Sequence, residues 1–266
     1  MNLKERYGDK ALIAGASEGI GAAFAEYLAA EGFSLFLVAR RKEPLQKLAG
    51  MLTENYGVPV RHILCDLSGE NAAGQIISSM DGDEPDIMVY NAALSHIGPF
   101  ADHPVEGHCQ AARVNMTTPL KLVHHFGRKM LERKRGAIVL MSSLAGFQGS
   151  GFLASYAAGK AFNRILAESL WYEWKDNGVD IMACCAGATS TPGYVSSAPA
   201  RVSPFAPRVQ QPREVVRECF RELGRKPSSI TGRGNRIASF FMQRIFTRKM
   251  AARIMGDNIR KMYRLG

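Results

Sequence analysis

Short apolar runs alternate with segments of helix length along most of this chain, and this alternation restricts the fold more than any other feature. The runs stand at residues 10–14, 33–39, 58–65, 86–90, 137–141 and 179–185. Strands that are apolar almost throughout and alternate with helices form parallel sheets covered on both faces. The sequence therefore predicts an α/β fold: a single Rossmann-like, doubly wound parallel sheet of six to seven strands, with residues 228–231 as the seventh, edge strand.

We expect residues 1–266 to form one domain. The 266 residues are 46% hydrophobic, which suffices for a full core. Residues 191–212 contain five prolines, too many for a regular element, so this stretch is predicted to be a loop with a short helix that acts as a substrate lid. Residues 235–266 are predicted to form a basic, helical C-terminal extension of two packed helices.

The charge of the sequence is concentrated at one end. Residues 1–224 carry 23 Lys and Arg against 23 Asp and Glu, whereas residues 225–266 carry 11 basic residues and Asp257 alone. A run of like charge is most often a solvated helix surface. The alternatives are peripheral contact with acidic lipid headgroups, attraction of a phosphorylated carrier, or nucleic-acid binding. Specific nucleic-acid binding is not expected, because no feature of the sequence other than the basic tail points to it.

Composition also limits the location and the metal content. The N-terminal residues are charged and lack an apolar signal segment, and no apolar run approaches the length of a membrane span. Neither the five cysteines nor the six histidines show metal-ligand spacing, so no metal is expected. An odd number of cysteines, mostly in apolar segments, is typical of a protein with buried free thiols in a reducing compartment. We therefore expect a cytoplasmic protein, with membrane association through the tail as the alternative.

A glycine-rich loop joins the first predicted strand to the first predicted helix. Glycines let the backbone approach a pyrophosphate, and a helix N-terminus offers free N–H groups and a partial positive charge. An ordinary glycine-rich turn is the alternative, but this position in an α/β pattern favours dinucleotide binding. The residues expected to bind the cofactor here are Gly15, Ser17, Gly19, Ile20 and Gly21.

The end of the second strand indicates which dinucleotide is bound. Ala39 stands where a carboxylate would accept hydrogen bonds from a ribose 2′-hydroxyl, and Arg40 and Arg41 follow it. Two arginines can pair with a 2′-phosphate, so NADPH is favoured over NADH, although both arginines could be solvated turn residues. Glu18, an acid inside the loop, is a counter-signal because it would not help a second phosphate.

Tyr156 and Lys160 lie one helical turn apart, so their side chains leave the same face of a helix. A nearby ammonium and an oxidised nicotinamide are expected to lower the phenol's pKa, so that Tyr156 exchanges a proton with the substrate oxygen while the cofactor exchanges hydride. Lys160 would also anchor the nicotinamide ribose. Ser143 would hydrogen-bond the reacting oxygen. Adjacent Ser142 competes for that role, and spacing favours Ser143.

Three further polar residues follow strands or lie in a helix and allow two interpretations each. Asp66 could bond the adenine amino group, and Asn91 could line the adenosine ribose, or either could cap a turn. Asn115 could hold a water that links Lys160 to solvent, or it could be a buried structural residue. The residues alone leave these alternatives open.

Together these residues resemble the short-chain dehydrogenase/reductase superfamily over roughly residues 8–235. The resemblance implies a catalytic set of Asn115, Ser143, Tyr156 and Lys160, and cofactor contacts from Gly187 and Thr191. It also implies a homodimer or homotetramer. The chain departs from the family pattern at Ala14, Tyr90, Ala93 and Ala186, which affect cofactor support more than chemistry. The matching elements are Gly15-x-x-x-Gly19-Ile-Gly21, Asp66-Leu67, Asn91-Ala92, Asn115, Ser143, Tyr156-x-x-x-Lys160 and residues 187–191.

The expected activity is NADPH-dependent reduction of a carbonyl, or oxidation of a secondary alcohol, in a small apolar substrate. A 3-oxoacyl thioester reductase is the alternative enzyme, and a noncatalytic NADPH-binding regulatory protein is the alternative of another class. Apolar residues near the expected mouth of the site offer no carboxylate clamp. The predicted substrate pocket consists of Leu94, Phe147, Phe152, Tyr194 and Phe205.

Overall fold

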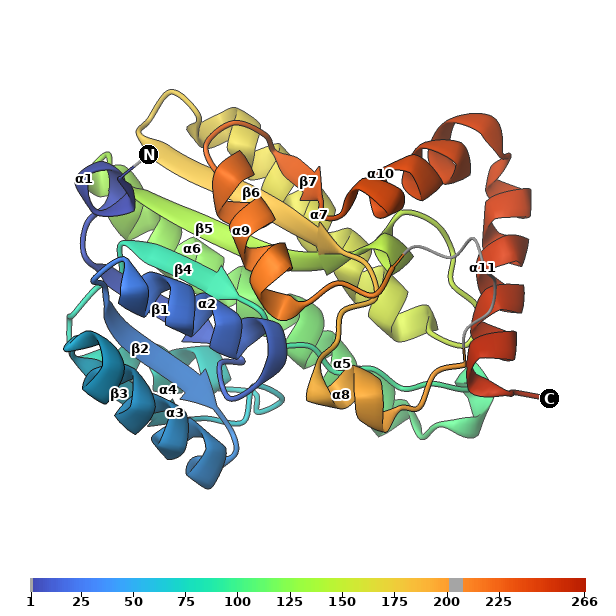
Figure 1. Cartoon of the computed structure of the whole chain (residues 1–266), viewed down its shortest axis with the longest axis horizontal. Coiled ribbons are helices and arrows are strands. Elements are labelled where there is room, and N and C mark those ends of the chain that lie inside the picture. Colours follow the sequence, from blue (N-terminus) through green and yellow to red (C-terminus); the bar gives the residue numbers. More distant parts are fainter. Residues whose placement is uncertain (1, 201–207) are drawn as a thin grey trace.

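A seven-stranded parallel sheet forms the centre of the molecule (Figure 1). The computed structural model describes residues 2–200 and 208–266. Strand order across the sheet is β3-β2-β1-β4-β5-β6-β7, and every neighbouring pair is parallel. The predicted fold class is therefore confirmed, including the seventh strand at one edge. The strands are β1 Lys10–Ala14, β2 Ser34–Ala39, β3 Val60–Leu64, β4 Ile87–Tyr90, β5 Gly136–Ser143, β6 Val179–Ala186 and β7 Ser228–Ile230.

Helices connect the strands and cover both faces of the sheet (Figure 1). The order of the strands reverses between β1 and β4, and ligands of open α/β sheets bind at such a reversal, beyond the carboxyl ends of the strands. The helices are α1 Leu3–Tyr7, α2 Gly19–Ala30, α3 Lys42–Tyr56, α4 Ala72–Met80, α5 Val105–Ala112, α6 Thr118–Glu132, α7 Ala154–Trp174, α8 Pro192–Ser196, α9 Pro212–Glu222, α10 Arg233–Phe240 and α11 Arg248–Tyr263.

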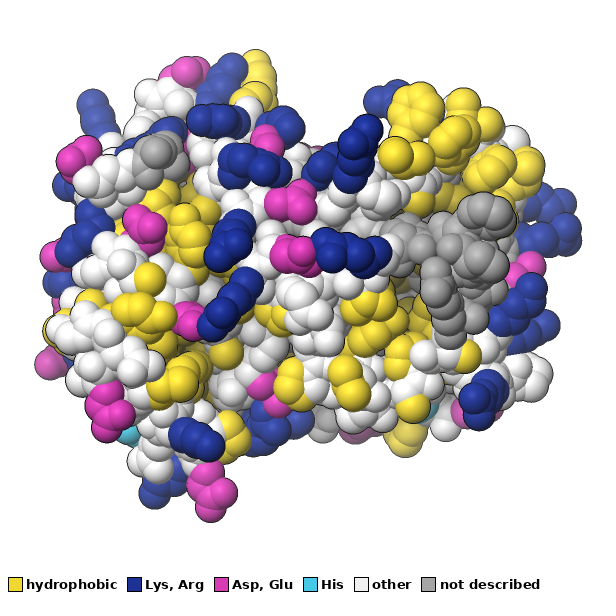
Figure 2. Space-filling view, viewed as in Figure 1, with side chains coloured by type: hydrophobic (Ala, Val, Ile, Leu, Met, Phe, Trp, Pro, Cys, Tyr) yellow, Lys and Arg dark blue, Asp and Glu magenta, His cyan; other side chains and the backbone are white. Residues whose placement is uncertain are grey.

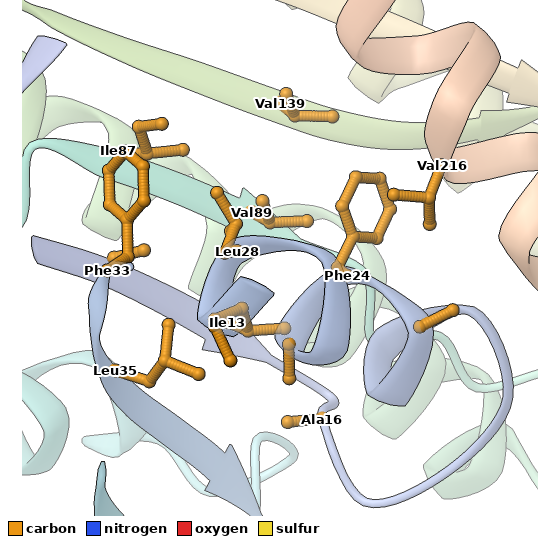
Figure 3. Packing of buried hydrophobic residues seen from close by; sticks show 14 of the residues in the cluster. Ile13, Ala16, Phe24, Leu28, Phe33, Leu35, Ile87, Val89, Val139 and Val216 are labelled. Carbon is orange, nitrogen blue, oxygen red and sulfur yellow. The ribbon is translucent and has the colours of Figure 1, made fainter. Parts of the chain in front are cut away.

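Alternate residues of each strand point to opposite faces, so the sheet separates two hydrophobic layers. On one face, Ile13 and Val89 pack against Phe24 of α2 and Val216 of α9 (Figure 3). On the other face, Leu12 belongs to a second cluster that α4, α6 and α7 cover. This double burial explains why the central strands β1, β2, β4, β5 and β6 are mostly apolar, and it fixes the strand ends on which the site is built.

The predicted helical extension is present as α10 and α11, which stand at the end of the molecule away from α1 (Figure 1). A π-helical turn, Phe241–Ile245, follows α10. Helix α11 packs on the loop between β5 and α7, where a Cβ on Gly151 would lie 3.3 Å from the Cα of Gly256. Ala251 and Ile259 of α11 are buried. The extension is thus folded against the body of the protein.

Candidate active site

A cavity of about 1730 Å³ opens where the carboxyl ends of the central strands meet. Single-ligand pockets are usually about 300–1,000 Å³, so this one has room for a dinucleotide and a second molecule. Most of the predicted site residues line it. They are Gly15, Ser17, Gly19, Ile20, Arg40, Arg41, Asp66, Asn91, Leu94, Ser143, Tyr156, Lys160, Gly187, Thr191 and Tyr194.

The glycine loop forms a tight cradle at the start of α2. A Cβ on Gly21 would overlap the carbonyl oxygen of Gly15, so only glycine fits there. The side-chain amide of Asn91 donates to the same oxygen at 2.9 Å and holds the loop. Glu18 precedes α2 but makes no side-chain capping bond, which leaves the first-turn N–H groups free of that partner. These groups fit a pyrophosphate.

Both arginines after β2 lie at the edge of the same cavity. The guanidinium of Arg41 is 2.6 Å from a carboxylate oxygen of Glu18 and 3.4 Å from the hydroxyl of Ser17. Asp66 accepts bonds from the backbone N–H and the hydroxyl of Ser68, at 2.9 and 2.8 Å. The backbone bond chiefly lowers the pKa of Asp66, and Arg40 adds a smaller effect. Asp66 therefore caps a turn, whether or not it also meets a ligand.

Helix α7 brings Tyr156 and Lys160 to the cavity wall beside the end of β5. The Nζ atom of Lys160 lies 5.6 Å from the centre of the Tyr156 ring and donates to the carbonyl oxygen of Met141 at 2.8 Å. The hydroxyl of Ser143 hydrogen-bonds the phenol of Tyr156. The hydroxyl of Ser142, by contrast, donates to the backbone oxygen of Lys160 at 2.7 Å. Of the two serines, Ser143 is the one in contact with the phenol.

Burial shifts the pKa values of Tyr156 and Lys160. Burial raises the pKa of Tyr156, and the hydrogen bond from Ser143 only partly opposes this effect. Burial also lowers the pKa of Lys160 to about 8. The expected lowering was for the phenol beside both the ammonium and an oxidised nicotinamide. In the protein alone desolvation dominates the pKa of Tyr156, and the ammonium of Lys160 donates to Met141. At neutral pH the phenol keeps its proton.

Asn115 is fully buried and does not line the cavity. It lies in a π-helical turn, Arg113–Thr117, between α5 and α6. Its side-chain oxygen accepts from the N–H of Leu94 at 2.9 Å, and its amide donates to the oxygen of Leu94 at 2.7 Å. A Cβ on Gly159 of α7 would lie 2.6 Å from the Cβ of Asn115. The contacts favour the structural alternative for this side chain: it fixes the cavity-lining loop at Leu94.

Two of the aromatic residues predicted for the substrate pocket are not in the cavity lining. The ring of Phe147 lies 4.6 Å from the guanidinium of Arg164, and the ring of Phe152 lies 5.4 Å from that of Arg260. The backbone of Phe152 has a φ of 63°, a left-handed turn that sequence patterns do not reveal for a phenylalanine. Phe205 lies outside the described residues. Leu94 and Tyr194 do line the cavity.

The C-terminal extension supplies an apolar wall that the sequence interpretation missed. Tyr263, at the end of α11, lines the same cavity as Tyr156 and Tyr194. A repeat of apolar residues every three to four positions along α11 was the signal, and the many arginines concealed it. The lining residues from this region include Phe241, Met242, Phe246, Ile254, Met255, Ile259, Met262 and Tyr263.

Two kinds of site are not found in the described part of the chain. No group of three or more His, Cys, Asp or Glu side chains could hold a metal ion within residues 2–200 and 208–266. Among the same residues, no helix combines the length and the apolar character needed to cross a membrane.

Comparisons with known proteins agree with this geometry. The model of the short chain dehydrogenase family matches residues 9–201. A 7β-hydroxysteroid dehydrogenase from Collinsella aerofaciens is 38% identical over 240 residues, covering 89% of this chain and 90% of the relative. A solved structure from a study of 7β-hydroxysteroid dehydrogenase stereoselectivity is 36% identical, with a TM-score of 0.89 over 96% of this chain and 99% of that one. A short-chain dehydrogenase from Sphingobium yanoikuyae, solved with NADPH, is 29% identical, with a TM-score of 0.74 over 84% of this chain and 87% of that one.

Proposed function

The chain belongs to the short-chain dehydrogenase family, and from that premise we propose that it is an NADPH-dependent oxidoreductase that interconverts a secondary alcohol and a ketone on a hydroxysteroid. The observation that carries the proposal is the contact of Ser143 with Tyr156, beside Lys160, on the wall of a large cavity. These groups can hold and protonate a carbonyl oxygen.

The cofactor assignment is supported by the cradle at the start of α2 and by the two arginines at its edge. The glycine loop fits a pyrophosphate because its backbone carries no Cβ at Gly21 and the following helix begins with available N–H groups. Arg40 and Arg41 would receive a 2′-phosphate. A relative of similar fold was solved with NADPH, which agrees with this assignment.

In the proposed reduction, the hydride would come from NADPH once it is bound. Tyr156 would give its proton to the carbonyl oxygen. The phenol holds this proton at neutral pH, and the positive charge of Lys160 would have to offset the raised pKa that burial gives the phenol. Ser143 donates to the developing alkoxide, and the end of β5 holds it in place. Lys160 supplies positive charge behind the phenol. For alcohol oxidation, Tyr156 would instead have to lose its proton first.

The substrate class is inferred from the walls of the cavity and from the relatives. Apolar side chains of α11 and of the turn after α10 line the same cavity as Tyr156. A rigid, apolar, polycyclic alcohol fits such a wall, and the C. aerofaciens relative is named for a 7β-hydroxysteroid. A 3-oxoacyl thioester remains the second candidate, because exposed basic residues of the extension, Arg248 and Lys249 among them, could attract a phosphorylated carrier.

A panel of substrates tests this proposal. Purified protein would be given NADPH with 7-oxosteroids, small ketones and 3-oxoacyl thioesters, and loss of NADPH absorbance would be followed. We expect the highest kcat/KM for a 7-oxosteroid. A preference for the thioesters would select the second candidate. If no ketone were turned over, the remaining interpretation would be a noncatalytic NADPH-binding protein.

Tyr156→Phe tests the role of the phenol. The variant keeps the ring but cannot donate a proton, so kcat should fall by about 100-fold or more. NADPH affinity, measured by fluorescence, should stay within about threefold of the original value. Tyr172→Phe, at an exposed position of the same helix, is the matched control. Unchanged turnover in Tyr156→Phe would reject the assignment.

A further inference from the structure

An acidic side chain lies where the proposed cofactor would carry its most negative group. Glu18 immediately precedes α2, and its carboxylate is 2.6 Å from the guanidinium of Arg41. The same guanidinium is 3.4 Å from the hydroxyl of Ser17. All three residues, together with Arg40, line the cavity. The ion pair thus joins the loop after β1 to the end of β2, at the site proposed for the 2′-phosphate.

The contribution of this ion pair to folding does not explain the acid. The side chains of Arg41 and Glu18 are 48% and 41% exposed, and ion pairs with that exposure contribute little to stability. Glu18 also makes no side-chain capping bond to α2. A carboxylate in a loop that receives phosphates is electrostatically unfavourable for binding them. Its effect should therefore appear in the choice between ligands.

We infer that Glu18 is a specificity-determining residue that limits the preference of this protein for NADPH over NADH. The inference rests on the proposed function, since it concerns the same cofactor site. A 2′-phosphate must displace the carboxylate from Arg41 or share the guanidinium with it, and the two anions repel each other. The 2′-hydroxyl of NADH carries no charge and can donate a hydrogen bond to the carboxylate.

Arg40 keeps some preference for the phosphate in place. It forms no ion pair within residues 2–200 and 208–266, and its side chain is exposed at the cavity edge. Arg40 can therefore receive the 2′-phosphate without breaking an ion pair. The two arginines then have different roles: Arg40 attracts the phosphate, whereas the attraction of Arg41 is partly neutralised by Glu18.

The test measures binding of two nucleotide fragments to Glu18→Gln by titration calorimetry. Adenosine 2′,5′-bisphosphate carries the 2′-phosphate and AMP does not, so their ratio isolates that group. A single charge about 6 Å from a divalent phosphate in a largely aqueous setting changes affinity by about three- to tenfold. Glu18→Gln should raise the ratio of bisphosphate affinity to AMP affinity by this factor, and the gain should shrink in about 0.5 M salt.

Two controls separate a local effect from a general one. Glu54→Gln removes the same charge at an exposed position near the far end of α3 and should leave both affinities unchanged. In an Arg41→Ala background the carboxylate is no longer neutralised, so adding Glu18→Gln should restore bisphosphate binding by at least as large a factor as in the original protein.

The outcomes distinguish this inference from the proposed function. If the unaltered protein binds the bisphosphate more tightly than AMP, but Glu18→Gln leaves their ratio unchanged, the role of Glu18 is overturned and the NADPH assignment stands. If the unaltered protein binds none of the four ligands (the bisphosphate, AMP, NADPH and NADH), the proposed function itself fails. If Glu54→Gln tightened bisphosphate binding as much as Glu18→Gln does, the effect would come from the net charge of the protein. This result would also overturn the inference.

Discussion

At the scale of single residues, burial controls the protonation of the site. Tyr156 and Lys160 are both desolvated, which favours the neutral form of each: the pKa of the phenol is raised and that of the ammonium is lowered to about 8. Near pH 7 the phenol is protonated and most of the ammonium is still charged. Both forms are the ones that carbonyl reduction requires.

This arrangement predicts a pH dependence. The folded-state pKa of Lys160 is depressed, so its charge is present below about pH 8 and is lost as pH rises through that value. The kcat/KM for NADPH in the reduction, which reports the free enzyme, should therefore fall above about pH 8, by up to tenfold per pH unit. Initial rates from pH 6 to 10 would check this. A profile flat to pH 10 would contradict it.

The same residues show what sequence could and could not predict at this scale. Tyr156 and Lys160 were predicted to share a face because helix geometry is local, and Ser143 was preferred over Ser142 by spacing alone. The rise in the pKa of Tyr156 in the protein alone was not foreseen, because burial and the bond from Lys160 to Met141 depend on how α7 packs against its neighbours. The spacing of two residues in a sequence does not show how far their side chains are removed from water.

At the scale of elements, regular structure was more predictable than side-chain direction. The central strands were located because burial on both faces demands mostly apolar residues, whereas the edge strands β3 and β7 contain polar residues and gave a weaker signal. Phe147 and Phe152 were expected in the substrate pocket but contact Arg164 and Arg260 instead, since the left-handed turn at Phe152 sets the path of the loop. Irregular loops have no periodic signal from which such a direction follows.

Helix α11 is the element from which the substrate preference should arise. Met255 and Met262 line the cavity, and about 100 Å² of apolar contact with a polycyclic substrate is worth about 2.5 kcal/mol, or about 70-fold in kcat/KM. The double variant Met255→Ser/Met262→Ser should lose roughly that factor with a 7-oxosteroid and less than about threefold with a small ketone. Steady-state kinetics with both substrates would measure the difference.

The exposed side of the same helix provides the control for this prediction. Lys249→Ala/Lys261→Ala changes α11 at two exposed positions and should leave both kinetic constants unaltered. Melting temperatures of all variants would show whether α11 remains folded on the loop at Gly151. Equal losses for the steroid and the small ketone in the methionine variant would mean that α11 does not select the substrate.

At the scale of the whole molecule, the extension carries the excess charge and also exposed apolar side chains. Figure 2 shows hydrophobic side chains gathered over the corner between α10 and α11. Ile237, Phe240, Phe241 and Ile245 are each about half exposed there. Arg244 and Arg248 lie in the same stretch and form no ion pair within the described residues. A purely solvated charged helix, the interpretation that sequence favoured, does not account for this exposed apolar surface.

Apolar side chains bordered by arginines suit an anionic bilayer surface, and two facing copies of the same surface would repel each other. We therefore expect cosedimentation with anionic vesicles at about 20 mM salt and at least tenfold weaker binding at 150 mM, because each basic residue near the surface contributes about 1 kcal/mol and salt screens it. Phe240→Ser should weaken binding at both salts, whereas Tyr172→Ser, at an exposed position of α7, should not. If sedimentation velocity instead showed Phe240→Ser turning a dimer into monomers, with no vesicle binding at either salt, the surface would be a contact between copies of this chain.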